Sequence, residues 1–136
     1  MVQRVILFRG KKLGTGEWIE GSAFFEYNPI FPCLGLTHCI RDLGNEYHFV
    51  EPETVGQYVC RVAENYERVF EGDIIKVSFE SDGEYIEDIF EVVYSDEKAA
   101  FVLRDSQEHE DEMLSQELFH EYKAKVIGNR WDGIEK

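Results

Sequence analysis

The chain has 136 residues, of which 43% are apolar and 14% aromatic, so it can bury a core of its own and is not a disordered acidic tail. Fourteen basic against 28 acidic residues give a formal net charge of -14, which disfavours general binding to nucleic-acid phosphates. No apolar run approaches the roughly 20 residues of a membrane-spanning helix, and no signal-peptide cleavage site is visible. We therefore expect a cytosolic protein without membrane contact.

The first half of the chain contains a predicted hairpin followed by a segment without a clear period. Residues 2–8 and 17–25 are rich in β-branched and aromatic side chains and are predicted strands, joined by a turn over the Lys- and Gly-rich residues 10–16. Prolines and glycines interrupt residues 28–44, which we expect to form a loop with room for short strands. A short strand at residues 47–50 is predicted to end before Pro52.

The second half has a clearer alternation of apolar and polar residues. It predicts strands at residues 55–60, 73–79, 85–94, 99–103 and 123–131. Ser81-Asp82-Gly83-Glu84 has the composition of a hairpin turn, because glycine tolerates the positive φ that tight turns require. Residues 105–112 are predicted to form an acidic loop. The near-helical spacing of Met113, Leu114, Leu118 and Tyr122 predicts one short helix over residues 112–120.

Short strands separated by turns, in meander order, predict a mainly β fold. We expect a small antiparallel β-barrel or sandwich of the SH3-like kind, with an N-terminal β-hairpin lobe and at most one short helix. The expected division is an N-terminal hairpin lobe with an irregular loop over residues 1–54 and an antiparallel barrel over residues 55–136. The two parts together are expected to form one compact unit.

Five segments, in this order, resemble the YopX-like family of small phage and prophage proteins: residues 6–11 (ILFRGK), 16–22 (GEWIEGS), 52–58 (PETVGQY), 69–75 (VFEGDII) and 126–129 (VIGN). The resemblance covers nearly the whole chain. It implies a mostly β protein of phage origin that acts in the cytosol of a Gram-positive host, and it implies no particular activity. Family members usually continue after Gln-Tyr with Thr-Gly-Leu, Asp and a Gly-centred turn, whereas this chain has Val59–Glu67 there. Any ligand that the family shares at this turn is therefore in doubt here.

Glu71, Gly72 and Asp73 form the most tempting candidate site. Two carboxylates around a glycine could hold a metal ion or act as general acid and base. A structural interpretation is favoured, in which Gly72 adopts positive φ and the Asp73 side chain accepts hydrogen bonds from nearby backbone N–H groups. We therefore predict a structural turn at this position.

Three further groups of residues were considered as sites. Cys33, His38, Cys39 and Cys60 offer zinc ligands, but their spacing is poor and reduced structural thiols are favoured. Glu108, His109, Glu110, Asp111 and Glu112 lack the pattern of an EF-hand loop. They are predicted to form a solvated acidic loop, and the alternative is a surface that docks a basic partner. The aromatic clusters at residues 24–27 and 47–49 lack interleaved Lys or Arg, so we expect them in the core.

These observations predict no catalytic, metal-binding or cofactor-binding residue. The favoured function is a non-enzymatic protein–protein interaction module that binds an unidentified host or phage protein, with self-association into a homo-oligomer as a further expectation. The alternative is an acidic decoy that mimics DNA and occupies a host nucleic-acid-binding protein. A third class, less favoured, is a metal-dependent hydrolase or nuclease that uses Glu71 and Asp73.

Overall fold

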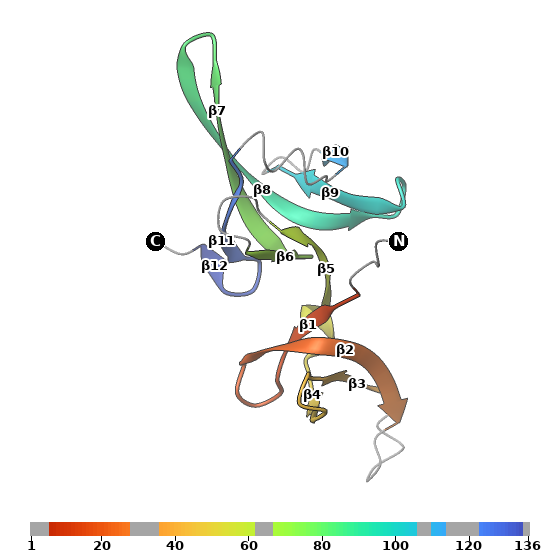
Figure 1. The fold of residues 1–136 in the computed structure, drawn as a ribbon. Helices are drawn as coiled ribbons and strands as arrows, with labels where there is room; N and C mark the ends of the chain where they lie inside the picture. Colours follow the sequence, from red (N-terminus) through yellow and green to blue (C-terminus); the bar gives the residue numbers. More distant parts are fainter. Residues whose placement is uncertain (1–5, 28–35, 62–66, 106–109, 114–122, 135–136) are drawn as a thin grey trace, which may run out of the picture. The chain divides into compact units, whose positions relative to one another are not determined.

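The computed structural model describes residues 6–27, 36–61, 67–105, 110–113 and 123–134 (Figure 1). Nearly all of the regular structure in these residues is antiparallel β-strand, apart from one 3₁₀ turn, η2 (Pro52–Thr54). The chain divides into two compact units, residues 1–58 and residues 59–136. The division falls inside strand β5 (Gly56–Arg61), a few residues after the boundary that the sequence suggests. The predicted mainly β fold is confirmed.

The strands form two six-stranded sheets. The first has the order β4-β3-β2-β1-β5-β6 and comprises β4 (Tyr47–Phe49), β3 (Leu36–Arg41), β2 (Trp18–Tyr27), β1 (Phe8–Lys11), β5 and β6 (Arg68–Phe70). The second has the order β10-β9-β8-β7-β11-β12 and comprises β10 (Glu110–Met113), β9 (Ala100–Arg104), β8 (Glu84–Ser95), β7 (Asp73–Ser81), β11 (Lys125–Asn129) and β12 (Gly133–Ile134). Both sheets are open, so the described strands do not close into a barrel.

The core of the second unit follows from alternation along its strands. Ile75 and Val77 of β7 point to the same side and are buried together with side chains from four other segments. The buried cluster comprises Val69, Ile75, Val77, Val92, Leu103 and Ala124. In the first unit the buried apolar side chains are Cys39, Ile40 and Val50.

The predicted hairpin turn at residues 81–84 is confirmed. Asp82 and Gly83 both have positive φ, 51° and 81°, which is the backbone of a type I′ turn. The turn joins β7 to β8 in continuous register from Ser81↔Glu84 to Ile74↔Glu91. The turn residues and the alternation of the strands both favour this hairpin, so it is predictable from the sequence.

The first predicted strand is misplaced. β1 begins at Phe8 and includes Gly10 and Lys11, which were assigned to the turn, while residues 2–5 lie outside the described part of the chain. Gly10 faces the core, where a Cβ in its place would lie 3.2 Å from Ile40 Cδ1 and Val50 Cβ. Gly10 therefore permits close packing inside a strand, and the turn predicted from it is wrong.

Residues 36–41 lie in the segment expected to be a loop with room for short strands, and they form the six-residue strand β3, which pairs with β2 from Tyr27↔Leu36 to Ser22↔Arg41. The assignment of residues 110–113 is wrong. Residues 110–113 form the edge strand β10 and pair with β9, although they were assigned to an acidic loop and to the start of a helix. In both cases backbone pairing with another strand overrides a weak local signal. The rest of the predicted helix lies outside the described residues.

The last predicted strand is shorter than expected. β11 ends at Asn129, whose side-chain Oδ1 accepts the N–H groups of Trp131 (3.0 Å) and Asp132 (2.9 Å). This Asx-type turn reverses the chain into β12, which pairs back onto β11. No helix in the described residues is long and apolar enough to cross a membrane.

Candidate functional site

Three potential metal ligands gather on the β3–β4 hairpin: Asp42, Glu46 and His48. One ligand atom from each lies within 4.8 Å of the others, and no second group of three such residues is found in the described part of the chain. Asp42 directly follows β3, and His48 is the central residue of β4. The tight turn between the strands is what brings the three side chains together.

Backbone hydrogen bonds fix this turn. The Asp42 N–H donates to the Glu46 carbonyl (3.0 Å), and the Asn45 N–H donates to the Asp42 carbonyl (3.0 Å). Asn45 has a φ of 67°, a left-handed conformation that asparagine tolerates better than most residues. The Glu46 N–H then donates to Asp42 Oδ1 (3.0 Å). One oxygen of the Asp42 carboxylate is thus held by the backbone, and the other faces His48.

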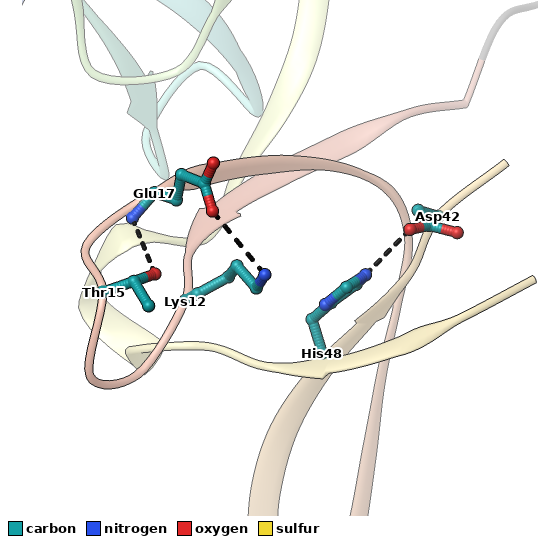
Figure 2. A network of polar contacts seen from close by, with 5 residues as sticks. All are labelled: Lys12, Thr15, Glu17, Asp42 and His48. Carbon is teal, nitrogen blue, oxygen red and sulfur yellow. Dashed lines mark hydrogen bonds and ion pairs between the residues drawn. The ribbon is translucent and has the colours of Figure 1, made fainter. Parts of the chain in front are cut away.

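That other oxygen, Asp42 Oδ2, lies 2.8 Å from His48 Nε2, as Figure 2 shows. The His48 and Asp42 side chains are only 13% and 26% exposed. His48 is the cross-strand partner of the fully buried Ile40, which places the imidazole on the core side of β4. The hydrogen bond from His48, followed by that from the Glu46 N–H, lowers the pKa of Asp42, so the carboxylate is negatively charged at neutral pH.

The neighbouring β1–β2 turn supports this hairpin. The Leu13 N–H donates to the Phe49 carbonyl (2.9 Å), and Lys12 forms a bridge with Val50. Lys12 Nζ lies 3.6 Å from Glu17 Oε2, and the Glu17 N–H donates to Thr15 Oγ1 (3.2 Å; Figure 2). Backbone hydrogen bonds therefore join the β1–β2 hairpin to the β3–β4 hairpin beside His48.

The Glu71-Gly72-Asp73 segment has the contacts of a structural turn. Asp73 is 1% exposed, and its Oδ2 accepts the Phe70 N–H at 2.8 Å. Gly72 has a φ of 93°, donates its N–H to Val92 (2.8 Å) and accepts the Arg130 N–H (2.9 Å). These bonds join the turn to β8 and to the chain after β11. A carboxylate so enclosed is poorly placed to meet a substrate.

The predicted acidic docking segment is only partly described. Glu110, Asp111 and Glu112 belong to β10, at the edge of the second sheet, while Glu108 and His109 lie outside the described residues. The segment is thus an edge strand over part of its length, with an irregular register between Glu110 and Met113.

In the described part of the chain, His38, Cys39 and Cys60 are not grouped as metal ligands. Cys39 and Cys60 are free thiols, and Cys33 lies outside the described residues. Burial raises the pKa of Cys60 to about 12 and also raises that of Cys39, so both remain thiols at neutral pH. His38 and Cys39 are consecutive in β3 and point to opposite faces, and the His38 ring meets Phe25 edge-on at 4.4 Å. They are not placed to share an ion.

The aromatic clusters differ from the expectation that they are core. Phe25, Tyr47 and Phe49 are exposed, and the exposure of Tyr47 and Phe49 follows from the edge position of β4. The sequence shows no Lys or Arg beside them, yet the sheet supplies cations from other strands. Arg41 lies over the Tyr47 ring at 5.4 Å. Outside the two clusters, Arg9 and Lys11 lie over the Trp18 ring at 4.5 and 5.4 Å.

In the second unit, β7 and β8 extend beyond the strands that flank them. β11 pairs with β7 only over Asp73–Lys76, and β9 pairs with β8 only over Glu91–Ser95. Residues 77–90, which we name the β7–β8 arm, therefore pair only with each other in the described residues. Figure 1 shows this ribbon continuing past β9 and β11.

The arm combines acidic and exposed apolar side chains. It has no basic residue, and its acidic residues are Glu80, Asp82, Glu84, Glu87 and Asp88. Tyr85 is 64% and Ile89 47% exposed. Tyr85, Glu87 and Ile89 alternate along β8 and so share one face of the ribbon.

Comparison with known proteins gives one family match: the family model described as YopX protein matches residues 7–133. Neither the curated proteins nor the solved structures give a match to this chain.

Proposed function

The chain belongs to the YopX family, and we propose that it is a non-enzymatic protein–protein interaction module, of phage or prophage origin, that works in the cytosol of a bacterial host. The observation that carries this proposal is the β7–β8 arm, whose two strands lack flanking strands in the described residues. The docking element is the arm, and the partner is a host or phage protein.

The open edges of the arm favour strand addition. A two-stranded ribbon is only marginally stable in water, and each of its outer edges presents N–H and C=O groups that a further strand can bind. Proteins commonly use such an edge to capture an extended segment of a partner, with backbone bonds for affinity and side-chain contacts for specificity. The edge strand β10, which contains Glu110, Asp111 and Glu112 of the predicted acidic segment, is a second edge of this kind.

The side chains of the arm define the chemistry of the partner. Exposed aromatic and aliphatic residues are the usual anchors of a protein interface, which makes Tyr85 and Ile89 the expected anchors here. The five carboxylates of the arm favour a partner whose docking strand is flanked by Lys or Arg. The partner is therefore a protein with a basic, partly apolar edge strand.

The decoy that mimics DNA remains the second candidate because the acidic charge is concentrated in one unit. Residues 1–58 contain five basic and seven acidic residues, and residues 59–136 contain nine basic and 21 acidic residues. The net formal charges are therefore -2 and -12. A decoy would act through the second unit, and its binding would weaken steeply with salt.

The test compares the full-length protein with two variants as baits in host lysate at about 0.1 and 1 M NaCl. The Tyr85→Ser/Ile89→Ser variant removes both anchors, and Ile134→Ser removes an exposed apolar residue of the same unit outside the arm. We expect one protein retained by the wild type and by Ile134→Ser at both salt concentrations and lost from the double variant. The purified partner must then bind with the same pattern.

Three outcomes would contradict the proposal that the arm binds a host or phage protein. Equal capture by the double variant would remove the arm as the docking element. The decoy would be supported by a partner that salt releases and that the double variant still binds. Such a partner should be lost after Glu80→Gln/Glu84→Gln/Glu87→Gln. Sedimentation that shows a dimer abolished by Tyr85→Ser/Ile89→Ser would instead identify a second copy of the chain as the occupant of the arm.

A further inference from the structure

We propose that Asp42, Glu46 and His48 form a binding site for a divalent metal ion of the zinc class. The site lies in the first unit and shares no residue with the β7–β8 arm. It therefore goes beyond the interaction module and is tested independently of it.

The donor atoms are close to the arrangement that such an ion requires. They lie within 4.8 Å of one another. Zinc bonds nitrogen and oxygen at about 2.0–2.2 Å in tetrahedral geometry, which sets neighbouring ligand atoms roughly 3.3–3.6 Å apart. The ion would therefore widen the 2.8 Å separation between His48 Nε2 and Asp42 Oδ2 slightly and draw the exposed Glu46 carboxylate inward.

The hairpin also orients the ligands. The Glu46 N–H holds Asp42 Oδ1, which directs Oδ2 toward the imidazole, and metal-binding carboxylates are commonly fixed by such an outer hydrogen bond. Arg41, the last residue of β3, lies over the Tyr47 ring.

The donor set selects the kind of metal. One imidazole and two carboxylates suit Zn²⁺, Co²⁺ or Ni²⁺, because Ca²⁺ and Mg²⁺ prefer shells of oxygen only. Three protein ligands leave a fourth position for water or for a group from another molecule.

The experiment is calorimetric titration of the full-length protein with ZnCl₂ in excess MgCl₂, which occupies dispersed surface carboxylates. We expect one equivalent of zinc to bind, with affinity at least tenfold lower in His48→Gln and in Asp42→Asn. The control is His38→Gln, which removes an imidazole from β3 that is outside the group and should leave the affinity unchanged. Thermal unfolding of each variant without metal verifies that it is folded.

A second measurement keeps the test independent of variant stability. In ¹⁵N-labelled wild-type protein, zinc should shift the Nε2 resonance of His48 and leave that of His38 in place. No zinc binding, or equal binding by the wild type and His48→Gln, would overturn the proposal. Binding that shifts other histidines while His48 stays unchanged would also overturn it, and the Asp42–His48 contact would then serve only to close the hairpin.

Discussion

The ring of Trp131 lies directly against the backbone of Gly72. A Cβ placed on Gly72 would come within 2.5 Å of two ring atoms, Cη2 and Cζ3 of Trp131. The turn that begins β7 is thus covered by a side chain from the turn after β11. This contact, together with the buried Asp73, makes the segment resembling a carboxylate site a packing feature of the second unit.

Gly72→Ala should destabilise the protein by about 2–4 kcal/mol, because positive φ costs roughly 1–2 kcal/mol for a non-glycine residue and the clash with Trp131 adds to it. Urea unfolding measures the loss. The matched control is Gly83→Ala, whose φ of 81° is similar but whose Cβ would meet no atom within 4 Å. Equal losses in the two variants would show that the Trp131 contact contributes nothing.

Asp73→Ala should reduce the free energy of unfolding by about 1–3 kcal/mol, since it leaves the buried Phe70 N–H without this acceptor. Chemical denaturation gives the value, and Glu71→Ala in the same turn is the comparison. A nuclease assay on both variants separates structure from chemistry. A folded Asp73→Ala protein that loses a metal-dependent activity of the wild type would support the enzyme class instead.

The Asp42–His48 contact predicts a specific dependence of stability on pH. The pKa of Asp42 is lower in the folded protein than its ordinary value of 3.8, so the charged carboxylate stabilises the fold above that value. This contribution is lost as the pH falls through the lowered pKa. The difference in melting temperature between the wild type and Asp42→Asn should therefore be constant above pH 5 and shrink below about pH 4. A difference that grows in acid would contradict the assigned direction.

The buried thiols should react slowly with alkylating reagents. Burial raises the pKa of Cys60 to about 12, and the thiolate is the nucleophile, so little of the reactive form exists at pH 8. Peptide mass spectrometry after treatment with iodoacetamide measures the rate at each cysteine. We expect labelling of Cys60 to rise sharply when the chain is unfolded in urea. Equal rates in the folded and unfolded chain would show that this thiol is accessible.

The parts of the fold that sequence reasoning predicts are those with short-range signals. The β7–β8 hairpin is one, because Gly83 supplies the turn and Ile75 and Val77 supply the alternation. β3 and β10 differ from this hairpin, because they are recognised as strands by their pairing with β2 and β9 and not by an alternating pattern in their own sequence. Residue propensities do not reveal which strands pair with each other.

The candidate metal site was missed for the same reason. Asp42, Glu46 and His48 are separated by three and one residues, a spacing that indicates nothing until β3 and β4 are recognised as a hairpin. The sequence Asp42-Leu43-Gly44-Asn45 is the signal that could have located the turn, because Asp, Gly and Asn are typical turn residues. Similarly, the cations near Trp18 and Tyr47 come from positions that only the strand register brings beside these rings.

The unequal division of charge gives the two units different responses to their surroundings. The carboxylates of residues 59–136 repel one another, and this repulsion opposes the compact state of the second unit. Dissolved ions screen the repulsion over distances longer than the Debye length. Added salt should therefore slow amide hydrogen exchange in β7, β8 and β9 while leaving exchange in β2 and β3 nearly unchanged. Ionic strength would thus selectively stabilise the compact state of the unit that carries the arm.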